Sequence, residues 1–136
     1  MAYIVLGQAH DAHAQHILEK LRARDVDAYL LQTYDFPRSV QFSFSPNNEC
    51  GSLTLKCGTK LSLNDIKAVF WRNFSGVSDE DTRDNFMTEA GIAAKDSMAC
   101  LRTWFYLNNG TKWLNSWEAF QHHQEKPYQL LKVKGL

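Results

Sequence analysis

Three short apolar runs, at residues 3–6, 26–31 and 66–71, limit the folds open to this chain. The third is nearly continuous in apolar residues, which is typical of a strand covered on both faces of a parallel sheet. Between the first two runs the apolar residues follow helical spacing, at Ala14, Ile17, Leu18 and Leu21. Because a βαβ crossover is right-handed and joins parallel strands, the pattern predicts two neighbouring parallel strands with a helix on one face.

Between residues 36 and 62 the apolar residues alternate with polar ones instead. Residues 40–44 and 53–55 have this period of two, and the link between them, residues 46–51, is rich in turn-forming residues. The pattern predicts an antiparallel hairpin inserted before the third parallel strand, extended by a short piece near Leu61.

The second half of the chain is expected to be mainly helical. A long helix is predicted to begin at residues 78–81, which offer a capping serine and acids, and to end near residues 108–110. A short strand at 111–114 follows. Asn115 and Ser116 then cap a helix at 117–124, and Pro127 suits the first turn of another helix.

These elements define an α/β fold, a Rossmann-like three-layer domain with a mainly parallel sheet and an inserted antiparallel hairpin. With 136 residues the chain forms one ordinary domain, which we divide into a sheet domain at 1–115 and a helical segment at 116–136. The 15 basic residues balance the 15 acidic ones, so neither nucleic acid nor a membrane surface is an expected partner. No apolar stretch is long enough to span a bilayer.

The chain begins without the basic region and cleavage site of a secretory signal. An odd number of cysteines, Cys50, Cys57 and Cys100, then indicates free thiols in the cytoplasm. Cys50 and Cys57 match no metal or redox spacing and are interpreted as packing thiols. A cysteine nucleophile activated by a histidine remains an alternative, although no neighbouring residues in the sequence support it. No catalytic residue is assigned.

Histidines at positions 10, 13 and 16 diverge around a helix, so we expect exposed side chains and no metal site. The sequence contains neither the G-x-G-x-x-G motif of dinucleotide-binding folds nor the phosphate-binding motif G-x-x-x-x-G-K-[ST]. In open α/β sheets, however, ligands approach the carboxyl ends of the strands. Polar residues follow the predicted strands at Gln8, His10, Asp11, Thr33, Asp35, Arg72, Asn73 and Asn115. These residues either line a binding site or are capping and loop residues that face water or a neighbouring domain.

The second half is also rich in aromatic residues, such as Trp104, Trp113 and Trp117. Most of them are expected in the core. Because burying all of them in so small a domain is difficult, some are expected to form an apolar face for a partner.

Several segments, taken in order, resemble the N-terminal domain of ATP-grasp ligases, called the pre-ATP-grasp domain. The resemblance is strongest to the ligases that mature ribosomal peptides of the microviridin type. It covers essentially the whole chain and depends on residues 4–6 with the loop that follows, 21–24, 33–37, 66–72, 113–115 and 125–131.

This resemblance implies an enzyme that activates a carboxylate as an acyl phosphate and closes an amide or ester bond in a precursor peptide. Lys126 matches the lysine that reaches the nucleotide phosphates, while Arg72 and Asn115 match positions that face the interdomain cleft. His10 and Asp35 are placed at the same cleft. ATP and Mg²⁺ are expected in the full-length enzyme, with neither bound to this chain alone.

The partners implied are ATP-grasp lobes downstream in the same polypeptide and a precursor peptide, with a homodimer as a further state to be tested. On this interpretation the chain alone is not catalytic. The alternative is a stand-alone flavodoxin-like module that binds a small ligand or a peptide at the strand ends.

Overall fold

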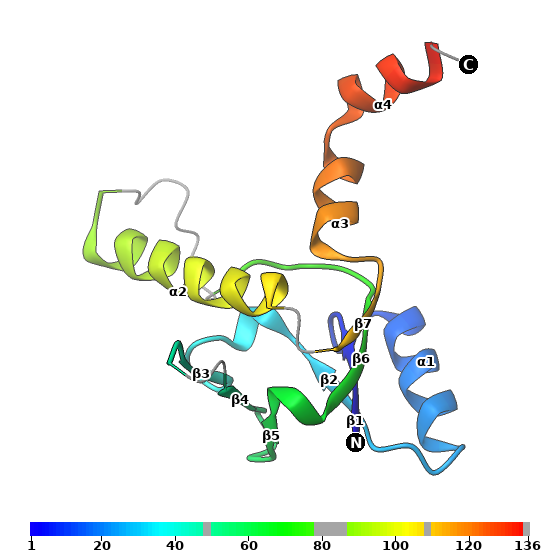
Figure 1. Ribbon diagram of the computed structural model, residues 1–136, viewed down its shortest axis with the longest axis vertical. Helices are drawn as coiled ribbons and strands as arrows, with labels where there is room; N and C mark the ends of the chain where they lie inside the picture. The colour runs from blue at the N-terminus through cyan, green and yellow to red at the C-terminus, as the bar shows by residue number, and fades with distance from the viewer. Residues whose placement is uncertain (48–49, 78–86, 108–109, 135–136) are drawn as a thin grey trace.

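The computed structural model describes residues 1–47, 50–77, 87–107 and 110–134, and its centre is a four-stranded parallel sheet (Figure 1). The strand order is β2-β1-β6-β7, and every neighbouring pair is parallel. The strands are β1 (Ala2–Leu6), β2 (Ala28–Leu31), β6 (Ile66–Trp71) and β7 (Lys112–Leu114). The predicted parallel sheet is therefore confirmed, with β6 at the residues expected from its apolar run.

A separate antiparallel sheet lies between β2 and β6 in the sequence. It has three strands in the order β3-β4-β5, so the piece near Leu61 does extend the predicted hairpin. Gly51 is required in β4, because a Cβ there would lie 2.6 Å from Leu63 Cδ1 and 2.8 Å from the Ser43 carbonyl oxygen. The strands are β3 (Gln41–Ser45), β4 (Cys50–Thr54) and β5 (Lys60–Ser62), with 3₁₀ turns at Thr33–Asp35 and Leu63–Asp65.

Helices cover both faces of the parallel sheet. α1 (Ala12–Arg22) packs Ala14 and Leu18 against Val5 and Ala28 on one face. α2 (Glu89–Tyr106) lies on the other face, where its buried residues Leu101, Trp104 and Phe105 are part of a larger hydrophobic core. The domain therefore has the three layers expected from the sequence.

The long helix begins later than predicted. The expected start at 78–81 lies outside the described residues, and Thr88 precedes the helix in an extended conformation. Its hydroxyl accepts a hydrogen bond from the Gly91 N–H at 3.2 Å, which makes Thr88 the N-cap. The local cap therefore sets the start of α2 at Glu89.

The indole of Trp71 lies at the centre of an aromatic cluster. Its ring centroid is 4.8 Å from that of Phe105 on α2 and 5.4 Å from that of Phe120 on α3 (Trp117–Gln124). It also packs against Phe74, Trp113 and Trp117. Most of the aromatic residues are therefore core, as expected.

The exposed apolar face lies elsewhere, on α4 (Lys126–Lys134). This helix projects away from the sheets beyond α3 (Figure 1), and none of its residues is buried. Leu130, Leu131 and Val133 are 71%, 68% and 65% exposed. Tyr128 stacks on His122 of α3 at 5.7 Å, and this contact helps to hold α4 against α3.

We expect Trp71→Ala to lower the free energy of unfolding by about 3–5 kcal/mol, because the substitution leaves a large cavity between β6, α2 and α3. Urea denaturation measures this loss. Ile92→Ala on the exposed side of α2 is the control and should change the midpoint little, since Ile92 is 53% exposed. Equal effects of the two variants would contradict the central role of Trp71.

Candidate functional site at the strand ends

The carboxyl ends of β1, β6 and β7 meet, as the parallel topology requires. The Asp11 carboxylate, in the loop after β1, lies 3.3 Å from Nε of Arg72, which directly follows β6. Asn115, directly after β7, donates a hydrogen bond from Nδ2 to the Trp71 carbonyl oxygen at 3.3 Å. Arg72 and Asn115 are thus brought together at one edge of the sheet.

Two hollows open around these residues, with volumes of about 470 and 330 Å³. Both are lined by Trp71, Arg72 and Asn115, so we treat them as one feature, the strand-end groove. On the α1 side the groove is also lined by Ala12, His13, His16, Ile17 and Phe70. On the α3 side it is lined by Ala119, Phe120 and His123. These volumes are of the size that small ligands and peptide side chains occupy.

Asp11 links α1 to the groove. Its carboxylate accepts a hydrogen bond from the Ala14 N–H at 2.9 Å, as an N-cap does, and also pairs with Arg72. The Ala14 N–H and, to a smaller extent, the Arg72 guanidinium hold the pKa of Asp11 below its usual 3.8, against the opposing effect of partial burial. The same charge thus caps the helix and orients the arginine.

Asn115 makes the turn between β7 and α3. Its φ of 62° lies in the left-handed region, which asparagine tolerates better than most residues. Ser116 then caps α3 by accepting a hydrogen bond from the Ala119 N–H at 3.2 Å. The predicted cap is confirmed, and it places Ala119, Phe120 and His123 along the groove.

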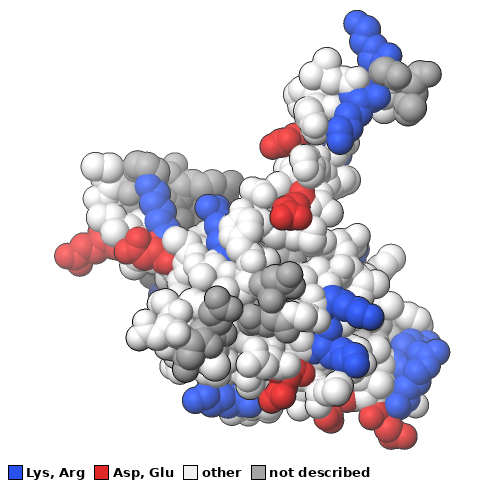
Figure 2. All heavy atoms as spheres, viewed as in Figure 1, with Lys and Arg blue, Asp and Glu red and all other residues white. Residues whose placement is uncertain are grey.

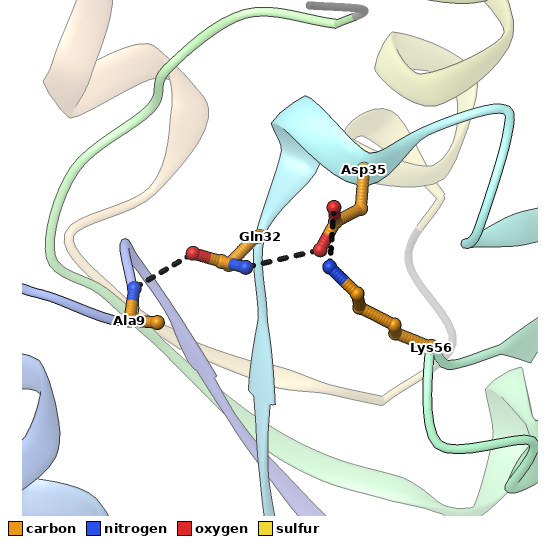
Figure 3. Close-up of polar contacts among 4 residues, drawn as sticks. All are labelled: Ala9, Gln32, Asp35 and Lys56. Carbon is orange, nitrogen blue, oxygen red and sulfur yellow. Dashed lines mark hydrogen bonds and ion pairs between the residues drawn. The ribbon is translucent and has the colours of Figure 1, made fainter.

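Asp35 lies in a different cluster, which joins the two sheets (Figure 3). Lys56 Nζ is 3.1 Å from Oδ1 of Asp35, and Gln32 donates to Oδ2 at 3.0 Å. Oε1 of Gln32 in turn accepts from the Ala9 N–H at 2.7 Å. Because both oxygens of Asp35 have partners here, the residue serves to connect β2 with the antiparallel sheet.

The remaining predicted residues lie outside the groove. His10 is exposed in the loop after β1. Lys126 is exposed at the first position of α4 (Lys126–Lys134), the helix that we call the projecting arm. Sequence reasoning noted His13 and His16 only as exposed histidines and missed His123. A signal for His123 was present in the sequence. Ser116 marks the start of a helix, and in that helix His123 lies three and four residues after Phe120 and Ala119, on the same face.

Among the described residues, no group of three or more His, Cys, Asp or Glu side chains is placed to hold a metal ion. Cys50, Cys57 and Cys100 are unpaired, as expected, but all are exposed, so interpreting the first two as packing thiols was wrong. Cys50 is the first residue of β4, and Cys57 lies in the link between β4 and β5, where the side chains of both are exposed. No described helix is both long and apolar enough to cross a bilayer.

Lysine and arginine side chains form no continuous surface on the face of the molecule in Figure 2. On this face they lie over α1, over α2, along the lower edge and at the end of α4, with acidic side chains between them. The balanced charge of the sequence is thus spread over this face.

Several solved structures match the fold of this chain over nearly its whole length. The macrocyclase MdnC from Microcystis aeruginosa MRC, bound with precursor peptide MdnA, superposes with a TM-score of 0.78 at 19% identity over 99% of this chain. A RiPP-associated ATP-grasp ligase from Chryseobacterium gregarium, in complex with ADP and leader and core peptides, gives 0.72 at 14% identity over 98%.

This chain has the fold of a part of RiPP-associated ATP-grasp ligases. The ATP-grasp ligase PsnB, complexed with a minimal precursor, also matches, with a TM-score of 0.72 at 24% identity over 98% of this chain. The chain spans only 44% of MdnC, 40% of the C. gregarium ligase and 43% of PsnB. No protein-family description matches the chain, and no curated protein matches it significantly. The fold implied by the sequence resemblance is confirmed.

Because the pKa of Asp11 is depressed, we expect its stabilising effect to be present above pH 4 and lost as the pH falls through its folded-state pKa. Asp11→Ala should therefore lower the melting temperature at pH 7 and have a shrinking effect as the pH is lowered toward 2. Thermal melts of both proteins across this range measure the difference. A gap of constant size at all pH values would contradict the role assigned to Asp11.

Proposed function

We propose that this chain is the N-terminal domain of an ATP-grasp ligase that forms amide or ester bonds in a ribosomally made precursor peptide, of the microviridin type, by way of an acyl phosphate. The observation that carries the proposal is the fold match over 98–99% of the chain to ligases solved with precursor peptides. The proposal places the enzyme in the cytoplasm, where unpaired thiols such as the three here persist.

The projecting arm supports a domain of a larger enzyme over a stand-alone module. Leu130, Leu131 and Val133 lie exposed on a helix whose interactions within the described residues are with α3. Apolar side chains gathered in this way usually mark a protein contact. On the proposal, the ATP-grasp lobes cover them. A homodimer through the same face is the competing arrangement, which sedimentation of the longer protein would detect.

The described residues do not form a nucleotide site by themselves. Lys126 is exposed, with no carboxylate partner among the described residues, and suits a single phosphate contact. Among the residues that the structure describes, the acidic ligands that Mg²⁺ requires are not grouped. ATP and Mg²⁺ are therefore assigned to the lobes of the full enzyme, with Lys126 as a contact from this chain.

The proposal is tested with the longer protein that contains this chain. Incubation with its precursor peptide, ATP and Mg²⁺ should remove one water molecule from the peptide for each bond formed, as mass spectrometry detects, and should release ADP and phosphate. The 136-residue chain alone should do neither. Tight binding of a small ligand by the chain alone, without ATP-dependent dehydration by the longer protein, would favour the flavodoxin-like module.

We expect Lys126→Met in the longer protein to raise KM for ATP about tenfold or more, because a charge-assisted contact to phosphate is lost. Lys134→Met, at the other end of α4, removes the same charge and is the matched control. Steady-state kinetics with varied ATP measure both. An unchanged KM in Lys126→Met would remove Lys126 from the nucleotide site.

A further inference from the structure

We infer that the hollow between the end of α1, β2 and the link from β4 to β5 is a modification site, at which the Cys57 thiol forms a mixed disulfide with a small disulfide that carries carboxylate groups. The hollow has a volume of about 340 Å³, and its lining includes Arg22, Tyr29, Leu30 and Cys57. Different residues line the strand-end groove. The inference concerns the chemistry of this chain alone, so it goes beyond the proposed function and does not depend on it.

The hollow suits a ligand that carries a carboxylate. Arg22 donates from Nε to the Ala28 carbonyl oxygen at 3.1 Å, which anchors the side chain without neutralising its charge. No carboxylate pairs with Arg22 in the part of the chain that the structure describes. Asp35 also lines the hollow, but its two oxygens are engaged with Lys56 and Gln32 (Figure 3). The terminal nitrogens of Arg22 are therefore available to bind an acid.

The rest of the lining is largely apolar. Tyr29, Leu30, Val40 and Leu55 contribute to it, from β2, the segment before β3 and the end of β4. A small disulfide such as glutathione disulfide has carboxylates that several bonds separate from its sulfurs. One carboxylate can contact Arg22 while the carbon chain lies against the apolar lining and a sulfur atom meets Cys57.

The turn between β4 and β5 presents the thiol to this hollow. The Leu55 N–H donates to the Thr59 carbonyl oxygen at 2.8 Å, and the Gly58 N–H donates to the Leu55 carbonyl oxygen at 2.8 Å. Gly58 has a φ of 84°, in the left-handed region that glycine adopts without strain. The turn therefore leaves the Cys57 side chain exposed, where a disulfide in solution has access to its sulfur.

The groups around the sulfur stabilise its thiolate. Sγ of Cys57 lies 3.2 Å from Oγ1 of Thr59, so this hydroxyl can donate to the sulfur once the thiol proton has left. The hydroxyl and the N–H of Thr59, the Cys57 N–H and the Arg22 guanidinium hold the pKa of Cys57 below its usual 9.0, against the opposing effect of partial burial. Because the thiolate is the nucleophile in disulfide exchange, Cys57 is more reactive near neutral pH than an ordinary cysteine.

The other two cysteines provide the comparison within the same chain. Cys50, at the start of β4, is exposed as well, but it does not line the hollow. Burial raises the pKa of Cys100 on α2, which lowers its thiolate fraction. Exposure is common to all three thiols, so the hollow with its cation is what distinguishes Cys57.

The exchange needs no redox partner besides the small disulfide. The Cys57 thiolate attacks one sulfur of this disulfide, a new S–S bond forms between them, and the original S–S bond breaks. The other half of the small disulfide leaves as a thiolate and takes up a proton. Cys57 is thereby oxidised and the leaving half is reduced, and a free thiol reverses the step.

The test incubates the 136-residue chain with glutathione disulfide at neutral pH and follows each cysteine by mass spectrometry of its proteolytic peptide. Cys57 should form the mixed disulfide about tenfold faster than Cys50 or Cys100, because its thiolate fraction is larger and the hollow retains the reagent. This comparison needs no variant. A rate for Cys57 no greater than that for Cys50 would overturn the inference.

A second reagent tests the part played by Arg22. Bis(2-hydroxyethyl) disulfide carries no carboxylate, so the ratio of the two rates at Cys57 reports the attraction of the acid. Arg22→Gln should lower this ratio about threefold, as expected for the loss of an exposed ion pair. Arg24→Gln, which removes the same charge just beyond α1, is the matched control and should keep the ratio. A ratio that Arg22→Gln leaves unchanged, with the fold confirmed by circular dichroism, would overturn the inference.

The pH dependence of the reaction provides a further readout. Thr59→Val removes the hydroxyl beside the sulfur, so the pKa of Cys57 should rise and its rate of alkylation by iodoacetamide should reach half of its maximum at a higher pH. Thr54→Val, at the end of β4, is the matched control and should leave this midpoint in place. Equal midpoints for the two variants would contradict the role of Thr59 and overturn the inference.

Discussion

The packing of the Trp71 indole holds the parts of this domain in their places. Its ring contacts Phe105 of α2 and both Trp117 and Phe120 of α3, so one side chain of β6 connects the sheet to two helices. Its carbonyl oxygen accepts from Asn115, which fixes the end of β7 beside the end of β6. The next residue, Arg72, therefore projects from a rigid position into the groove between α1 and α3.

The two polar clusters at the strand ends, one around Asp35 and one around Arg72, have different roles in the structure. Asp35, Gln32 and Lys56 satisfy one another and join the parallel to the antiparallel sheet, so little of their hydrogen-bonding capacity is left for a ligand. Arg72 and Asn115 line the strand-end groove, and the Asp35 cluster lines a separate hollow of about 340 Å³. What distinguishes the Asp35 cluster is that both carboxylate oxygens of Asp35 have partners that join the two sheets.

The exposed apolar side chains of α4 and the lining of the strand-end groove suggest two separate contacts for one domain. The arm lacks a core of its own and gains stability when other protein covers Leu130 and Leu131, since apolar area is then removed from water. The groove is already formed by packed elements. On the proposal made here, the arm joins the domain to the catalytic lobes.

Local patterns in the sequence determined the strands, the crossover helix and the caps at Asp11 and Ser116, because hydrophobic period and capping chemistry act over a few residues. They also placed Arg72 and Asn115 at one edge, since parallel strands end on the same side. Only the tertiary structure decided that Asp35 pairs with Lys56, that His123 joins His13 along the groove, and that the apolar face lies on α4. These features depend on distances between segments far apart in the chain, which no local pattern encodes.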